Sequence, residues 1–246
     1  MNLLFLKIVL FSLAASSYAW DPKDHDWHPP LPTDSSYQPT TPIPKLTKPG
    51  RSPCPGLNAM ANHNYLPRSG KNIDLATLRK AVSSAYNYHP TSFDDAFAQA
   101  VSFNLTTTGN ESTFHLVDLA RHDNIEFDGS LSRNDIYFGD NLHFDRNIWK
   151  TVAERLRLYE TLGSESNQYV TVEMAARARA ARVQDAKRAN PSFNASDSEM
   201  MASPGTTGLY LTTLWDDRVG AAPKAWIRAF FGMFFVRVWF WLMCQC

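Results

Sequence analysis

The sequence predicts a mainly α-helical protein with one domain, on three observations. Hydrophobic residues make up 44% and aromatic residues 13% of the 246 positions, enough for a sizeable buried core. From residue 70 onward, apolar residues recur with a period near 3.6, as on one face of a helix. Alternating strand patterns of useful length are scarce. We therefore expect one helical domain over residues 51–231, preceded by an extended Pro-rich arm.

Capping residues and prolines mark the ends of six expected helices. Asn72 and Asp74 open the first, and residues 92–95 open the second, with Ser92 as its cap and acidic groups in the first turn, where the helix dipole favours them. Pro191 ends the fourth, and Pro223 suits the first turn of the sixth. The six helices, in chain order, are predicted from these apolar residues or ranges: Leu75, Leu78, Val82 and Ala85; Phe97, Ala100 and Val101; Ile148, Val152, Leu156 and Tyr159; residues 170–189; residues 209–214; and the segment that begins at Lys224.

The charge balance excludes some classes of function. The 24 basic residues are matched by 24 acidic ones, so a nucleic-acid partner held by a basic surface is not expected. Three cysteines are too few for a disulfide scaffold. Four arginines of the fourth helix are expected on its solvated face: Arg177, Arg179, Arg182 and Arg188.

Residues 1–19 have the pattern of a secretory signal peptide. An apolar core of about ten residues ends in Ser17-Tyr18-Ala19, with small residues at the positions that a signal peptidase reads. A membrane anchor is the weaker alternative, because a spanning helix needs about 20 apolar residues. Three glycosylation sequons, at Asn104, Asn110 and Asn194, agree with secretion. We therefore expect an extracellular glycoprotein.

Residues 20–50 form a Pro-rich arm or propeptide, with eight prolines between Pro22 and Pro49. Proline removes backbone donors and favours extended conformations, so no helix or sheet is expected here. Two histidines and two aspartates could hold a metal ion weakly, although a solvated polar arm is the favoured interpretation: Asp24, His25, Asp26 and His28.

Residues 232–246 form an atypical apolar tail. The nearly unbroken apolar run 229–243 is too short to cross a bilayer comfortably and too apolar for an exposed surface. Cys244 and Cys246 are too close for an unstrained mutual disulfide. Membrane contact, burial and a mistaken gene translation remain the alternatives for this tail.

The densest chemical signal is Pro53-Cys54-Pro55, followed by Asn58 and His63. A cysteine between two prolines sits in a rigid turn, and the amides of a helix that begins just beyond Pro55 would favour thiolate over thiol. A fixed thiolate suits an axial haem ligand. The alternative is a buried, inert cysteine, and for His63 an ordinary helix histidine.

A second cluster covers residues 125–141. Glu126 and Ser130 offer hard oxygen ligands four residues apart, which suits Mg²⁺ or Mn²⁺ if another anion completes the shell. The alternative is a polar loop that caps a helix beginning near Ser132. His115, His122 and His143 show no ligand spacing and are expected to be structural or solvated.

Together these motifs resemble the fungal haem-thiolate peroxidases, the family of chloroperoxidases and unspecific peroxygenases. Residues 52–66 resemble its proximal haem-ligand motif, and residues 125–141 its Glu-His-Asp or Glu-Gly-Asp motif with the trailing serine. The resemblance resumes at residues 190–193, 209–211 and 222–231, in the same order and spacing.

The resemblance implies a helical haem domain that uses hydrogen peroxide on small organic substrates. It makes Cys54 the axial thiolate of haem b, with Pro53 and Pro55 beside the cofactor. It makes Glu126 and Ser130 ligands of Mg²⁺ or Mn²⁺ at a haem propionate, with the Phe127 carbonyl also available.

The sequence departs from the family at two positions. The distal glutamate, which moves the proton of the peroxide, aligns with Thr206, and the histidine beside it in the short-chain branch aligns with Phe127. Glu199 is about two helical turns, or about 10 Å, from position 206 unless Pro204 redirects the chain. The alternative function is therefore a haem-binding or interaction protein with weak or no peroxide chemistry. The Phe and Trp residues after 225 are expected in the core or an association surface.

Overall fold

The computed structural model describes residues 50–106, 111–160 and 168–231. The expected leader, residues 20–49 of the arm, Asn110 and the apolar tail lie outside these ranges. Within them the protein is mainly helical, which confirms the predicted fold class. The α-helices of the described part are α2 (Pro55–Asn62), α3 (Leu75–Tyr86), α4 (Asp94–Ser102), α5 (Arg146–Arg155), α6 (Val172–Ala189), α7 (Asp197–Thr213) and α8 (Lys224–Phe231).

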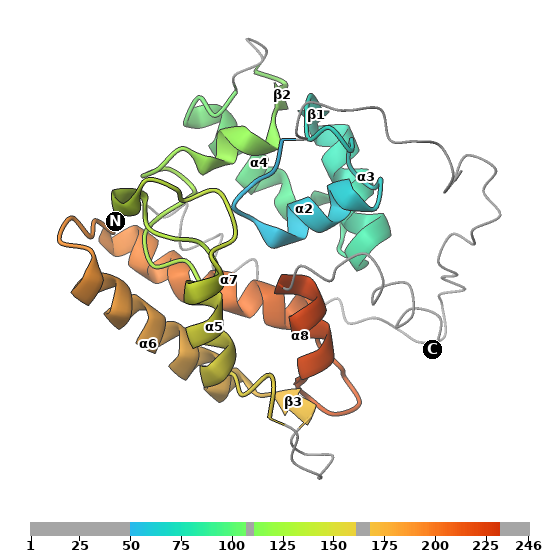
Figure 1. The fold of residues 1–246 in the computed structure, drawn as a ribbon. Coiled ribbons are helices and arrows are strands. Elements are labelled where there is room, and N and C mark those ends of the chain that lie inside the picture. The colour runs from blue at the N-terminus through green and yellow to red at the C-terminus, as the bar shows by residue number, and fades with distance from the viewer. Residues whose placement is uncertain (1–49, 107–110, 161–167, 232–246) are drawn as a thin grey trace, which may run out of the picture.

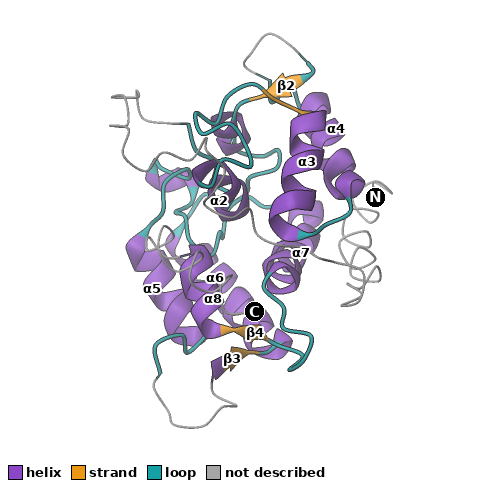
Figure 2. Cartoon of the chain, turned by 90° about the vertical axis from the view of Figure 1, so that its right-hand side faces the viewer, coloured by secondary structure: helices purple, strands orange, loops and turns teal. Residues whose placement is uncertain are grey.

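Two short antiparallel strand pairs tie distant segments together. β1 (Ile73–Asp74) pairs with β2 (Thr113–Phe114), and β3 (Tyr169–Val170) pairs with β4 (Ala222–Pro223). Figures 1 and 2 show α2, α3, α4 and the first pair in the upper part of the molecule, and α5, α6, α8 and the second pair in the lower part. Contacts between α2 and α8 join the two parts.

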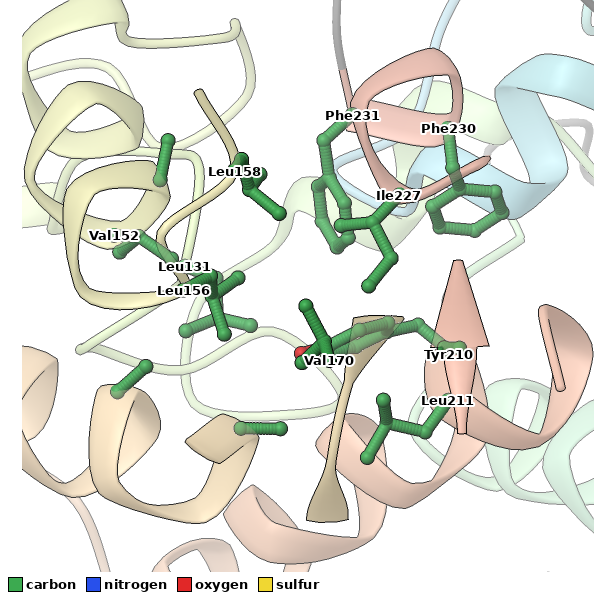
Figure 3. Packing of buried hydrophobic residues seen from close by; sticks show 14 of the residues in the cluster. Leu131, Val152, Leu156, Leu158, Val170, Tyr210, Leu211, Ile227, Phe230 and Phe231 are labelled. Atoms are coloured by element: carbon green, nitrogen blue, oxygen red, sulfur yellow. The ribbon is translucent and has the colours of Figure 1, made fainter. Parts of the chain in front are cut away.

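Each part has its own hydrophobic core. The upper core gathers residues of α2 and α3 with both strands of the first pair, and the lower core gathers residues of α5 to α8 (Figure 3). A fully buried Leu or Val side chain stabilises the fold by about 1.5–3 kcal/mol. Tyr86, at the end of α3, packs against both cores. Phe230 and Phe231 are buried in the lower core, as expected for the aromatic residues after 225.

The helix ends agree in part with the predicted caps. Asp74 accepts a hydrogen bond from the Thr77 amide at the start of α3, at 2.7 Å, as a capping aspartate should. Asp94 and Asp95 stand in the first turn of α4, as expected, but Ser92 does not cap this helix. A 3₁₀ turn, Pro90–Phe93, leads into it instead, because Pro90 fixes a helical φ one turn early.

Other predicted boundaries need correction. The sequence predicts that the fourth helix begins at Val170. α6 begins at Val172, after the capping residue Thr171, and Val170 belongs to β3. α5 ends at Arg155, so Tyr159 lies outside it and is 62% exposed. No helix begins near Ser132. The nearest helical segment is the 3₁₀ turn Ile136–Phe138.

The predicted helix over residues 209–214 is the last part of the much longer α7. A capping box between Ser196 and Glu199 starts α7, and the helix continues through Pro204 to Thr213. The apolar period is weak over the first two turns, so the sequence pattern revealed only the end of the helix. Within the described ranges, no helix combines the length and apolar character that a membrane span requires.

Candidate functional site

The Cys54 turn is built by local hydrogen bonds. Cys54 is the residue that precedes α2, with Pro55 as the first helical residue. Its amide donates to Ser52 Oγ at 3.0 Å. The Asn58 side chain holds Ser52 from both sides, since Oδ1 accepts from the Ser52 amide at 2.8 Å and Nδ2 donates to its carbonyl at 2.7 Å. These bonds and two prolines fix the backbone that carries the sulfur.

Cys54 is a free cysteine and is exposed, so the alternative of a buried thiol is wrong. It stands at the N-terminus of α2. The boundary between the upper and lower hydrophobic cores lies next to Cys54. A Cβ placed on Gly56 would be 3.8 Å from Cys54 Sγ and 3.5 Å from the Phe230 ring, and the Tyr86 hydroxyl donates to the Gly56 carbonyl at 2.9 Å. Burial raises the pKa of Tyr86, and the nearby Cys54 raises it further.

Glu126 lies in the loop between the 3₁₀ segment Leu116–Ala120 and α5, and it is 8% exposed. Its Oε2 accepts from Asn141 Nδ2 at 2.6 Å and meets His122 Nδ1 at 2.9 Å. Its Oε1 is buried and has no hydrogen-bond partner among the residues that the structure describes. Burial raises the pKa of Glu126 more than the bonds to His122 and Asn141 lower it.

His122 is the site residue that the sequence analysis missed. It precedes Glu126 by four residues, but in a loop rather than a helix, so the spacing gave no signal. Burial alone would lower the pKa of His122, and the bond to Glu126 with the charges of Asp123 and Asp128 raises it overall. His122 Nε2 lies 3.2 Å from Asp123 Oδ1 and 3.8 Å from Asp128 Oδ1.

Buried polar groups fix the segment from Asp128 to Asp135. Asp135 Oδ1 accepts from the Gly129 amide at 3.0 Å, and Asn190 Nδ2 donates to Asp128 and Asp135 at 3.0 and 3.2 Å. Gly129 has a φ of +83°, a conformation that favours glycine. The loop is therefore a packed element and not a solvated connection.

Two arginines of α6 hold this loop, which corrects their predicted solvent exposure. Arg179 and Arg182 are 5% and 3% exposed, whereas Arg177 and Arg188 are exposed as expected. Arg179 donates to the Gly129 carbonyl at 2.8 Å, and Arg182 donates to the Ser130 carbonyl at 2.9 Å and to Asp135 at 3.0 Å. Carbonyl and carboxylate acceptors compensate for the burial of both guanidinium groups. A sequence signal existed, because Arg182 continues the buried stripe of Ala175, Ala178 and Ala186.

Arg179 lies close to Phe127 and to Ser203, one turn before Thr206, and from the sequence we expect Phe127 and Thr206 to depart from the family pattern. Its guanidinium lies 5.9 Å from the centroid of the Phe127 ring, and its Nε donates to Ser203 at 2.5 Å. Thr206, one turn after Ser203 on α7, is exposed and donates its hydroxyl to the Ser203 carbonyl at 2.9 Å. Burial lowers the pKa of Arg179 to about 10.

Glu199 does not take over the position of Thr206. Because α7 is continuous through Pro204, seven residues of helix separate the two by about 10 Å. The Glu199 carboxylate is also engaged in the capping box, where Oε2 accepts from the Ser196 amide at 2.6 Å and from its hydroxyl at 2.8 Å.

The remaining predicted sites lie as follows. Among the described residues, no group of three or more His, Cys, Asp or Glu side chains is placed to hold a metal ion. The set predicted at the haem edge, Glu126, Ser130 and the Phe127 carbonyl, contains one carboxylate and is not such a group. Asn104 and Asn194 are exposed. His115 accepts from the Asn72 amide, and His143 pairs with Asp140 at the surface.

Comparison with known proteins places these features in a family. The family model described as "Peroxidase, family 2" matches residues 25–237, which is most of the chain. The chain belongs to peroxidase family 2. The match is wider than the span of the sequence motifs, because it includes part of the Pro-rich arm and six residues beyond Phe231.

Curated relatives of this peroxidase family 2 protein include peroxygenases and a chloroperoxidase. It is 28% identical to an aromatic peroxygenase of Coprinellus radians over 81% of this chain and 74% of that protein. An aromatic peroxygenase of Cyclocybe aegerita is 30% identical over 66% of this chain. A chloroperoxidase of Leptoxyphium fumago is 30% identical over 54% of it. The alignments span 47% and 35% of the latter two proteins, so less than half of each.

Proposed function

We propose that the protein is a secreted haem-thiolate peroxidase or peroxygenase that uses hydrogen peroxide to oxidise or oxygenate small organic substrates. The observation that carries the proposal is the exposed Cys54 thiol at the N-terminus of α2, in a locally fixed turn within the span matched by the family model. The organic substrate class is taken from the names of the relatives, which are peroxygenases of aromatic compounds and a chloroperoxidase.

The chain's residues fit a haem ligated by Cys54. The thiolate is held by the bonds of Ser52 and Asn58 and is favoured electrostatically by the helix that follows. Pro53 and Pro55 restrict the turn on either side. When bound, haem b supplies the redox chemistry through which peroxide oxidises the substrate. The protein's part is to fix the thiolate, orient the group and exclude water.

Glu126 and Ser130 are proposed to hold Mg²⁺ or Mn²⁺ at the edge of the haem, with the Phe127 carbonyl. The free Oε1 of Glu126 supports this, because a buried carboxylate oxygen without a partner is costly unless a cation or a donor reaches it. Arg182 fixes the Ser130 backbone from the far side of the loop. Oε2 stays bound to His122 and Asn141 and would orient the carboxylate.

We propose that this chain lacks the side chains that transfer the proton of the peroxide in the family. Thr206 has a hydroxyl that donates to Ser203, and a hydroxyl cannot act as a base near neutral pH. Phe127 has no proton to exchange. These two replacements favour the second candidate, a haem-binding or interaction protein on the same scaffold whose peroxide chemistry is weak or lost.

Secretion and N-glycosylation are part of the proposal. The leader and three sequons support it, and the exposed Asn104 and Asn194 are accessible to a glycosyltransferase. Glycosidase treatment of the protein secreted by a eukaryotic host should lower its apparent mass. An unchanged mass, or retention of the protein inside the cell, would contradict this part.

The spectrum of the CO-treated ferrous protein tests the haem assignment. We expect a Soret band shifted strongly to the red, as thiolate ligation produces, and its loss in Cys54→His. A matched control is Cys244→Ser combined with Cys246→Ser, which should keep the band. A red-shifted band that persists in Cys54→His overturns the proposal. A normal thiolate spectrum without peroxide consumption selects the second candidate.

A further inference from the structure

Arg133 differs from the other buried arginines of the described part in what surrounds it. It is 5% exposed, like Arg179, and Arg182 is 3% exposed. Arg182 pairs with Asp135, and Arg179 reaches a carbonyl and a hydroxyl. Within the described ranges, Arg133 donates only from Nη1 to the neighbouring Ser132 hydroxyl, at 2.5 Å, and its buried Nε has no hydrogen-bond partner.

A guanidinium in this position requires an anion. Arginine keeps its charge in proteins, and a buried charge without a counter-ion costs several kcal/mol. Among the described residues no carboxylate forms an ion pair with Arg133, and the ring of Phe144, 5.9 Å from the guanidinium carbon, compensates for only part of the charge. Burial lowers the pKa of Arg133 to about 10, and the nearby Cys54 is the one group that raises it.

A second unpartnered donor lies in the same neighbourhood. Trp149 is 5% exposed, and its indole nitrogen is buried with no hydrogen-bond partner. The Trp149 ring contacts Phe144, with centroids 6.2 Å apart, so both donors flank one aromatic ring. Trp149 also stacks on Phe231, whose neighbour Phe230 lies against Gly56 beside Cys54. Two buried N–H donors therefore lie around the Phe144 ring without an acceptor among the described residues.

We propose that Arg133 binds a carboxylate of the prosthetic group, with the Trp149 indole N–H as an auxiliary donor. The proposal rests on the haem-thiolate function above, since haem b carries two carboxylates and a planar guanidinium is matched to carboxylate geometry. Arg133 then anchors one edge of the haem independently of the cation at Glu126.

The test compares the affinity of the protein for haem with and without free carboxylates, and with and without the Arg133 guanidinium. Apo-protein is titrated with haem b and with haem b dimethyl ester, in which both carboxylates are methylated, in EDTA so that a bridging cation does not contribute. The variants are Arg133→Met and, as a matched control, Arg177→Met on the exposed face of α6. We expect the unmodified protein and the control to bind haem b about tenfold or more tightly than the ester. Arg133→Met should bind both haems equally.

The unfolding midpoint of the haem-free protein separates this role from a structural one. An apolar side chain of similar volume should leave the midpoint unchanged or raise it, because the unpaired charge is gone. A preference for haem b that persists in Arg133→Met overturns the proposal. So does an equal loss of affinity for both haems, which would instead indicate that Arg133 pairs with the Cys54 thiolate. If Arg133→Met does not fold, Arg133→Lys should keep part of the preference.

These outcomes are distinct from those that test the function. If the CO-ferrous spectrum of the unmodified protein lacks the thiolate signature, the haem-thiolate assignment fails. A preference for haem b that depends on Arg133 would still support the carboxylate contact.

Discussion

The Cys54 turn and the loop from Glu126 to Asp135 carry the two signature motifs, but they are held in opposite ways. The hydrogen bonds that fix the Cys54 turn join residues two to six positions apart. The loop has one local bond of this kind, from the Gly129 amide to Asp135, but its bonds to α6 and to Asn190 span 47 to 62 positions. The Cys54 turn is therefore specified locally, whereas the loop depends on the assembly of the whole domain.

The two regions also differ in the charges that they surround. The Cys54 turn lies at a helix N-terminus and near the buried Arg133, so the charges placed around it are positive. The loop gathers the carboxylates of Glu126, Asp128 and Asp135 and compensates for them with His122 and Arg182. Burial raises the pKa values of Glu126 and Asp128.

The largest expected effect follows from introducing a carboxylate at Thr206, where we propose that the distal base of the family is missing. Thr206 is exposed, so Thr206→Glu places a carboxylate on α7 without displacing the core. General acid–base assistance is typically worth about 10²–10⁴-fold, and we expect a gain in that range in the rate of the peroxide-dependent Soret change. Stopped-flow mixing measures it. Adding Phe127→His should increase the rate further by orienting the new carboxylate.

Thr212→Glu, at an exposed position on the same helix, serves as the control and should leave the rate unchanged. An unmodified protein that already reacts as fast as Thr206→Glu would show that another group transfers the proton. If neither the unmodified protein nor the variants react although a thiolate spectrum is present, the second candidate is favoured, a haem-binding or interaction protein without peroxide chemistry.

The second prediction concerns the long-range support of the loop. Arg182→Met removes one partner of a buried pair and leaves Asp135 with an uncompensated charge, for which we expect a loss of about 3–5 kcal/mol in the free energy of unfolding. Arg177→Met removes an exposed pair with Glu173 and should cost little. Urea unfolding of both variants measures the difference. Equal midpoints would mean that the loop does not depend on α6.

The sequence predicted the local features and missed the long-range ones for the same reason. A helix following the Cys54 turn, the Asp74 cap and the end of α6 before Pro191 are set by neighbours in the chain, and these predictions were confirmed. The burial of Arg179 and the pairing of His122 with Glu126 depend on packing, and no local pattern encodes packing. The family assignment was predicted because it rests on the order and spacing of motifs.

The smallest expected effect belongs to the Cys54 turn. Asn58→Ala removes the side chain that holds the Ser52 amide and carbonyl, and it leaves two partly buried backbone groups to find other partners. A lost hydrogen bond with an unsatisfied partner costs about 1–3 kcal/mol. The effect stays at the low end of that range, because the two prolines still restrict the backbone on both sides of Cys54.

The informative readout for Asn58→Ala is the comparison of stability with the thiolate spectrum. If the turn is specified locally, the variant should unfold at a slightly lower urea concentration and show a broadened red-shifted Soret band, because the sulfur is less well fixed. Asn62→Ala, which removes the acceptor of Arg51 at the other end of α2, should lower the midpoint without broadening the band. A band that is unchanged in Asn58→Ala would show that the cores around Tyr86 and Phe230, and not the local bonds, position the cysteine. The contrast between a locally built turn and an assembled loop would then no longer hold.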